Sequence, residues 1–118
     1  QTKLIKAGIT DDFTMGYADV SGFRLGTCRP VKWINPMTRQ LTSLTLHPLS
    51  VMDCTLSESQ YMGLPLNEAF RYCLQLLKQT KQYGGEIVWL WHNTSFAETE
   101  KNSYHKTLYV RLLNALIQ

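Results

Sequence analysis

The segment from Leu49 to Trp91 places one amphipathic stretch between two apolar runs, and this pattern restricts the possible folds more than any other feature. Apolar side chains recur every three or four residues from about Pro65 to Tyr83, which predicts a helix. The runs Leu49–Met52 and Glu86–Trp91 are typical of strands buried on both faces. A helix between two such strands implies a right-handed crossover between parallel strands. The sequence therefore predicts an α/β fold.

The remainder of the chain adds only short elements. We expect a helix end at Leu4–Gly8, a strand and loop at Ile9–Tyr17, a short strand at Phe23–Leu25, loops at Cys28–Thr42 and His92–Lys101, and a last helix at Ser103–Ile117. A sheet with so few strands leaves an edge exposed. This favours a fragment of a larger domain or a tight homo-oligomer.

Composition excludes several classes of protein. Hydrophobic residues make up 44% of the chain and charged residues 18%, unlike a disordered tail. The net charge of +3 is scattered, which argues against a nucleic-acid partner. No apolar run approaches the roughly 18–20 residues of a membrane span. Cys28, Cys54 and Cys73 form no CxxC pair, which predicts free thiols in a reducing compartment and favours the cytoplasm.

Polar residues stand where strands of the predicted sheet should end, which is where function collects in parallel α/β proteins. Arg24 lies in the short strand at Phe23–Leu25, Asp53 follows Leu49–Met52, and His92 follows Glu86–Trp91. A carboxylate beside a histidine orients the ring and favours its protonated form. Such a histidine can protonate a leaving group, and an arginine can hold the carboxylate or an oxyanion. The structural alternative is that these side chains only cap loops.

Other candidate residues carry weaker signals. The adjacent carboxylates of Asp11 and Asp12 lack further ligands at metal-binding spacing, so no metal site is predicted within this chain. His47 is expected in a loop and His105 on the surface of the last helix. Aromatic residues offer sugar-stacking surfaces, with Trp33 in a predicted loop as the exposed platform and Trp91 as a second candidate. Core packing is the alternative role for Trp91.

Several short motifs, in their order and spacing, resemble a known enzyme family. They are Gly22-Phe23-Arg24-Leu25-Gly26-Thr27-Cys28-Arg29-Pro30, Val51-Met52-Asp53-Cys54-Thr55-Leu56, Tyr61-Met62, Gly84-Gly85 and Leu90-Trp91-His92-Asn93. From about Ala7 to Leu116 the chain resembles the C-terminal part of polysaccharide deacetylases, the NodB-homology family or carbohydrate esterase family 4. Within that family it is similar to a bacterial branch with Phe-Arg-x-Gly-Thr-Cys and Leu-Trp-His-Asn motifs.

The resemblance implies a fold, a reaction and residue roles. Residues 1–118 would be the C-terminal half of a distorted (β/α)7 barrel with mainly parallel strands, flanking helices and a missing N-terminal half. The family removes acetyl groups from N-acetylated sugars with a divalent metal, usually zinc, and an activated water. By resemblance, Arg24 positions the catalytic aspartate, Asp53 tunes the histidine, His92 is the general acid, and Leu90 lines the acetyl pocket.

The family's Thr-Phe-Asp-Asp and His-x-x-x-His motifs, which supply the base and the metal ligands, do not occur in this sequence. In the first interpretation, the whole protein is a metal-dependent deacetylase and this chain supplies the half that carries the general acid. The chain by itself would then be inactive and would bind no metal. Its partners would be a carbohydrate and either the missing half or a second copy. The second is a non-catalytic carbohydrate-binding or structural barrel. A third is a stand-alone α/β interaction module.

Overall fold

A computed structural model gives the structure of residues 1–97 and 100–117. Residues 98 and 99, part of the loop expected at His92–Lys101, lie outside these described residues. The elements follow in the order α1 (Thr2–Lys6), β1 (Asp11–Met15), β2 (Val31–Asn35), β3 (Gln40–Met52), α2 (Asp53–Ser57), α3 (Leu66–Gln82), β4 (Val88–Leu90), the 3-10 helix η1 (Asn93–Phe96) and α4 (Glu100–Ile117).

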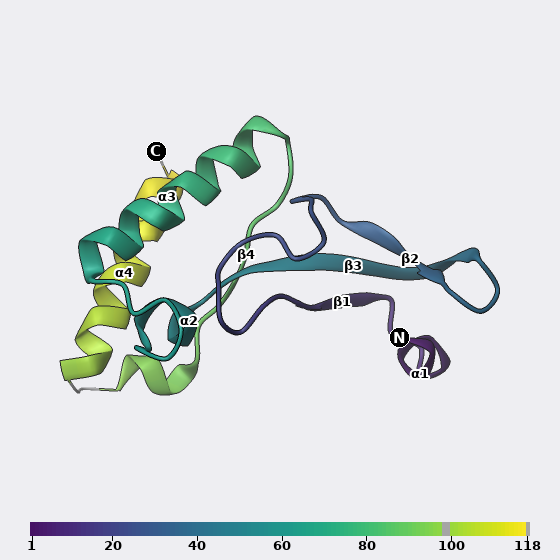
Figure 1. Ribbon diagram of the computed structural model, residues 1–118, viewed down its shortest axis with the longest axis horizontal. Helices are drawn as coiled ribbons and strands as arrows, with labels where there is room; N and C mark the ends of the chain where they lie inside the picture. The colour runs from purple at the N-terminus through teal and green to yellow at the C-terminus, as the bar shows by residue number, and fades with distance from the viewer. Residues whose placement is uncertain (98–99, 118) are drawn as a thin grey trace.

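The long strand β3 organises the sheet, because every other strand pairs with it (Figure 1). Its first part lies antiparallel to β2 and parallel to β1. Its last part lies parallel to β4, with Met52 opposite Leu90. The parallel pairing of β3 and β4, with α3 between them in the chain, confirms the predicted parallel pair joined by a helix, and it places the carboxyl ends of both strands at one edge of the sheet.

The predicted fold class is wrong in its architecture. The sheet is small, open and mixed, so the chain is not a mainly parallel fragment of a (β/α)7 barrel. The antiparallel strand β2 causes the difference. Residues 28–42, predicted as a loop, contain β2 and a tight turn in which the Arg39 N–H donates to the Asn35 carbonyl at 2.7 Å. Asn35 and Pro36 belong to that turn, which reverses the chain into β3.

Strand β3 passes through Pro48, where the sequence predicts a break. Pro48 is opposite Met15, at the end of the pairing with β1, and Leu49 begins the pairing with β4. Proline has no N–H to donate to a ladder and is tolerated where pairing changes. The β3 ladder can therefore change partners at Pro48 without leaving a strand hydrogen bond unmade.

The hydrophobic core lies at one end of an elongated molecule, where α2, α3 and α4 meet the end of β3 (Figure 1). The β2–β3 hairpin and α1 extend to the opposite end, and the longest dimension is 49 Å. The buried core residues are Val51, Leu56, Ala69, Cys73, Leu76, Leu108 and Leu112. This core fixes the carboxyl end of β3 and leaves the hairpin as a projecting arm.

Both long helices confirm their predictions. Helix α3 follows Pro65, carries Glu68 in its first turn and Lys81 in its last, and ends before Gly84, whose φ is +63°. Helix α4 contributes Leu108 and Leu112, both fully buried. None of the helices within residues 1–97 and 100–117 has the length and apolar character needed to cross a membrane.

Two strand predictions are wrong in detail. The segment Phe23–Leu25 is a turn, in which the Gly26 N–H donates to the Phe23 carbonyl at 2.9 Å, so Arg24 is not on a strand. Strand β4 has three residues, none of them fully buried, where six doubly buried residues were expected. The apolar character of this segment serves packing against α3 and α4 more than strand pairing.

Candidate functional site

The structure brings Asp53 and His92 together at the carboxyl ends of two adjacent strands. Asp53 directly follows β3 and His92 follows β4 by two residues. The Asp53 Oδ1 and His92 Nδ1 atoms lie 2.7 Å apart. The parallel register that places Met52 opposite Leu90 explains this distance, because it brings both chain exits to the same edge of the sheet.

The Asp53 carboxylate is fully buried and holds four hydrogen bonds. Oδ1 accepts from the Cys54 N–H at 2.8 Å and from His92 Nδ1. Oδ2 accepts from the His92 N–H at 2.8 Å and from the Ser95 hydroxyl at 2.5 Å. Burial acts to raise the pKa of Asp53, but the bonds from Ser95, His92 and Cys54 outweigh it, and the pKa lies below its ordinary value. The carboxylate is therefore ionised at neutral pH.

The His92 ring is anchored on one side and open on the other. Its side chain is 43% exposed, while its anchor Asp53 is fully buried. Nδ1 faces the carboxylate, which leaves Nε2 as the nitrogen available to a molecule at the surface. The turn η1 continues this arrangement, because the Ser95 N–H donates to the His92 carbonyl at 3.0 Å and its hydroxyl returns to Asp53. The arrangement orients the ring with a buried carboxylate and leaves its second nitrogen able to exchange a proton with a bound molecule.

Cys54 adds a sulfur to the same site. Its Sγ lies 4.0 Å from His92 Nδ1. Asp53, Cys54 and His92 each offer a ligand atom, all within 4.8 Å of one another, so the three could hold a metal ion. His92 Nδ1 serves both the metal group and the hydrogen bond to Asp53, so the two uses compete. A cysteine-protease arrangement does not fit, because the thiol and the carboxylate share one ring nitrogen.

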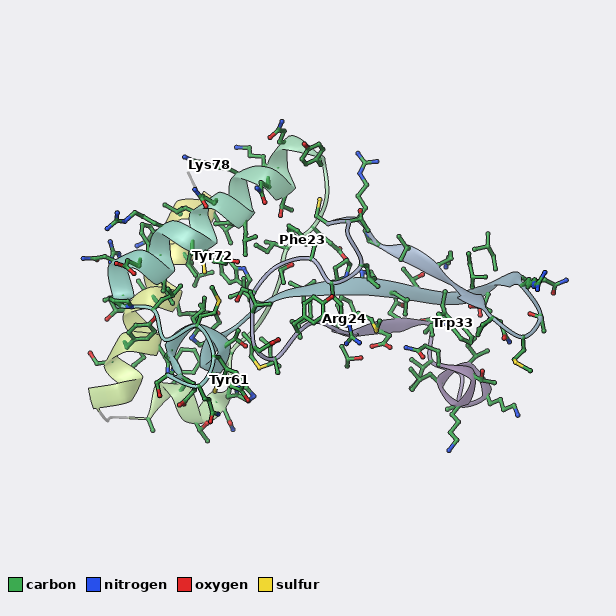
Figure 2. The ribbon with its side chains drawn as sticks, in the orientation of Figure 1. Phe23, Arg24, Trp33, Tyr61, Tyr72 and Lys78 are labelled. Carbon is green, nitrogen blue, oxygen red and sulfur yellow. The ribbon has the colours of Figure 1, made fainter. Side chains whose placement is uncertain are left out.

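Arg24 is not brought into contact with the Asp53–His92 pair. Its guanidinium donates to the Gly16 carbonyl at 3.1 Å and lies 5.4 Å from the centre of the Tyr17 ring. These are the contacts the described part of the chain gives it. Figure 2 places Arg24 beside β1 and the middle of β3, and Tyr61 beside α2. The role implied by the resemblance, in which Arg24 positions the catalytic aspartate, stays a prediction, and these contacts do not support Arg24 as the residue that holds the Asp53 carboxylate.

The three expected substrate-binding residues have different surroundings. Leu90 ends β4 beside the pair and is 40% exposed. Trp91 is tilted against Trp89 and Tyr109, and its Nε1 donates to the His105 carbonyl at 3.2 Å. It also lines an aromatic groove of about 430 Å³. Trp33 lies on strand β2, so its predicted position in a loop is wrong. It belongs to the arm beside α1, far along the long axis from α2, which begins at Asp53 (Figure 2). Leu90 and Trp91 can therefore border a substrate held at His92, and Trp33 cannot.

Sequence reasoning did not find two residues that support the site. Ser95 gave no signal beyond following His92 by three residues, the spacing of one tight turn. His105 was predicted on the surface, yet it is 2% exposed, and its Nε2 lies 2.8 Å from the Ser57 hydroxyl. Its spacing of three and seven residues from Leu108 and Leu112 places it on the buried face of α4, and this signal was available in the sequence.

Comparison of the chain with protein-family models, with curated proteins and with solved structures finds no match.

Proposed function

We propose that this chain supplies the proton-transfer group of a hydrolase that removes acetyl groups from N-acetylated sugars of a polysaccharide or glycan precursor. One observation carries the proposal: an exposed imidazole is fixed by a buried, ionised carboxylate where two parallel strands end. A histidine in this setting is a common general acid or base. The sugar and the acetyl group come from the resemblance of the motifs around Arg24, Asp53 and His92.

The proposed step is protonation of the leaving amine. Water adds to the acetamide carbonyl and gives one proton to a base outside this chain, the C–N bond breaks, and an amine and acetic acid, which then ionises to acetate, are the products. The amine leaves readily only when its nitrogen gains a proton, which the Nε2–H of His92 donates. Asp53 accepts from Nδ1 and fixes the ring so that Nε2 faces the surface. Ser95 and the Cys54 N–H hold the carboxylate in place.

The groove that Trp91 lines supports a carbohydrate partner. Trp89, Trp91, Phe96 and Tyr109 contribute aromatic faces to it, and two of them flank His92 in the sequence. Aromatic faces pack against the apolar side of sugar rings, while polar tips bind hydroxyl groups.

A divalent metal, zinc or another, belongs to this reaction in the family that the chain resembles, where it activates the water and polarises the carbonyl. The donor set of Asp53, Cys54 and His92 fits such an ion in type and spacing. All four hydrogen bonds of the Asp53 carboxylate are nevertheless already formed, so an ion there would displace His92 from Oδ1. We therefore assign His92 to proton transfer and place the family's metal on ligands outside this chain.

Acetate release from N-acetylated chito-oligosaccharides in the presence of zinc tests the proposal, measured on the protein as its gene encodes it. Replacement of His92 by Gln should lower turnover by roughly 10²- to 10⁴-fold. Asp19→Asn is the matched control, because Asp19 is exposed and outside the site. Equal rates for H92Q and D19N would remove His92 from the mechanism. Oligosaccharide binding without acetate release by the unaltered protein would favour the non-catalytic carbohydrate-binding alternative.

A second copy of the chain at the open edge of the sheet is a further part of the proposal. Sedimentation equilibrium should show a dimer at micromolar concentration. A monomer throughout would contradict it.

A further inference from the structure

A second histidine, His47 on β3, lies between two carboxylates. Its Nε2 is 2.6 Å from Asp11 Oδ1, and its Nδ1 is hydrogen-bonded to Glu86 Oε1. The ring stacks on Phe13, with centroids 4.1 Å apart and planes 10° from parallel. Only 14% of the His47 side chain is exposed. Both ring nitrogens are therefore engaged, and the ring is held flat against an aromatic face.

Two acceptors on one imidazole determine its protonation state. A neutral ring carries one N–H and one lone pair, so it donates to a single carboxylate and turns its lone pair towards the other. Only the imidazolium donates to both. A metal ion does not explain the cluster, because the two nitrogens point to opposite sides of the ring and no single position meets all three residues. With both carboxylates ionised, the geometry thus favours a proton on each nitrogen of His47.

The three residues join parts of the chain that are far apart in sequence. Asp11 begins β1, His47 precedes the proline at which β3 changes partners, and Glu86 leads into β4. The backbone at Glu86 has one further bond to the loop before β2, since its N–H donates to the Cys28 carbonyl at 2.9 Å. The cluster therefore spans the junction at which β3 stops pairing with β1 and starts pairing with β4.

The other polar groups around the cluster keep Asp11 ionised. The hydrogen bonds from His47 and Thr10 lower the pKa of Asp11 against the opposing effect of burial, and the charges of His47 and Lys32 add to this. Lys32 on β2 donates to the Thr45 hydroxyl at 2.7 Å and to the Ser43 carbonyl at 3.2 Å. Burial acts to lower the pKa of His47, but the bonds and charges of Asp11 and Glu86 outweigh it and raise the pKa above its ordinary value.

We propose that Asp11, His47 and Glu86 form a pH-operated clamp, which fixes β1 and the segment entering β4 to β3 while the ring is protonated. Loss of the proton forces the ring to release one carboxylate. When Glu86 is the carboxylate released, the segment that leads to His92 keeps the Glu86 N–H bond to the Cys28 carbonyl, the short β4 pairing and its side-chain packing. The clamp is a property of the fold and does not depend on the proposed deacetylase activity.

The direction of the pH dependence follows from linkage. The pKa of His47 is raised in the folded state, so the clamp contributes its full stability below the unfolded value of about 6.5 and loses it as the pH rises through the folded value. Each unit by which the folded pKa exceeds the unfolded one changes the opening equilibrium about tenfold. The local opening of residues 86–90 should therefore increase as the pH rises through the folded pKa, which lies above 6.5.

NMR titration of the histidine ring signals tests the clamp, with H47Q used to assign the His47 signal. His47 should titrate above 6.5, and Glu86→Gln should lower that value, whereas the control Asp19→Asn should leave it unchanged. Titration of His47 at or below 6.5, or an identical value in E86Q, would overturn the proposal. E86Q keeps the size of the side chain, so this result does not depend on whether H47Q folds well.

Amide hydrogen exchange gives an independent readout at Ile87 and Val88. After correction for the intrinsic pH dependence of exchange, opening in the unaltered chain should rise as His47 loses its proton. In E86Q the rise should be smaller, because one of the two carboxylates is already neutral. Equal pH profiles in both proteins would contradict the clamp.

Discussion

Replacement of Asp53 by Asn is the sharpest test of the site, because it changes the charge of the buried anchor and almost nothing else. Each carboxylate oxygen of Asp53 accepts one backbone N–H, from Cys54 on Oδ1 and from His92 on Oδ2. In asparagine one oxygen becomes an NH₂ group. Whichever way the amide turns, one of these backbone donors faces another donor in a buried place.

The cost follows from that unmatched N–H. A buried donor without an acceptor costs about 1–3 kcal/mol. The remaining bonds to Asp53 also lose their charge assistance, but the amide no longer carries the desolvation penalty of a buried charge, and the two effects oppose each other. We therefore expect D53N to lower the free energy of unfolding by about 2 kcal/mol. With a urea m-value of about 1–3 kcal/mol/M, the midpoint falls by about 1 M.

Urea denaturation followed by circular dichroism measures this change, with D19N as the control for loss of an exposed carboxylate. D19N should stay within about 0.5 kcal/mol of the unaltered chain. The dependence of the free energy of unfolding on pH in the acid range gives a second readout. Because the pKa of Asp53 is lowered, its stabilisation is present above the ordinary value of 3.8 and is lost as the pH falls through the folded value. In D53N the free energy of unfolding should fall less steeply as the pH is lowered through this range. A D53N midpoint equal to that of D19N would refute the four-bond anchor.

Three further predictions address local features. Ser95→Ala removes one donor from the Asp53 carboxylate and should cost about 1.5–3 kcal/mol in urea denaturation. Iodoacetamide should label Cys54, which is partly exposed, well before Cys73, because burial raises the pKa of the Cys73 thiol to about 12; mass spectrometry of the labelled peptides decides the order. Gly85→Ala should destabilise more than Gly26→Ala, since a Cβ at Gly85 would lie 2.5 Å from a backbone oxygen. A Cβ at Gly26 meets open space, so G26A costs only the roughly 1–2 kcal/mol of placing a non-glycine residue in a left-handed backbone conformation. Equal urea midpoints for the two variants would contradict this ranking.

The parts of the fold that sequence reasoning found are those specified locally. Helix α3 carries its own signals, in Pro65 at its start, apolar spacing along its length and Gly84 after its end. The Asp53–His92 contact was also accessible. Both residues follow strands joined by a helical crossover, and parallel strands end at one edge of a sheet. These predictions needed only the order of elements and the direction of two strands.

The parts that sequence reasoning missed depend on pairing between segments. Asn35 and Pro36 predict a loop, and in the structure they belong to the turn of a hairpin whose strands are β2 and β3. The available signal for a strand was the alternation of apolar Val31 and Trp33 with polar Lys32 between them. Once β2 is antiparallel, the sheet is mixed and a barrel fragment is excluded. The partner of a strand is decided by tertiary packing, which a window of a few residues does not contain.

His47 and His92 show why a histidine beside a carboxylate is not sufficient to define a proton-transfer site. The His92 ring meets its carboxylate through Nδ1 alone, and 43% of its side chain is exposed, so the other nitrogen can exchange a proton with a bound molecule while the anchor stays intact. His47 meets a carboxylate through each nitrogen and is 14% exposed, so it cannot lose a proton without breaking a contact within the fold. The same side chain therefore suits chemistry at the end of β4 and conformational control at the junction of β1, β3 and β4. Exchange of the His47 ring protons with solvent should accordingly be slower than that of His92.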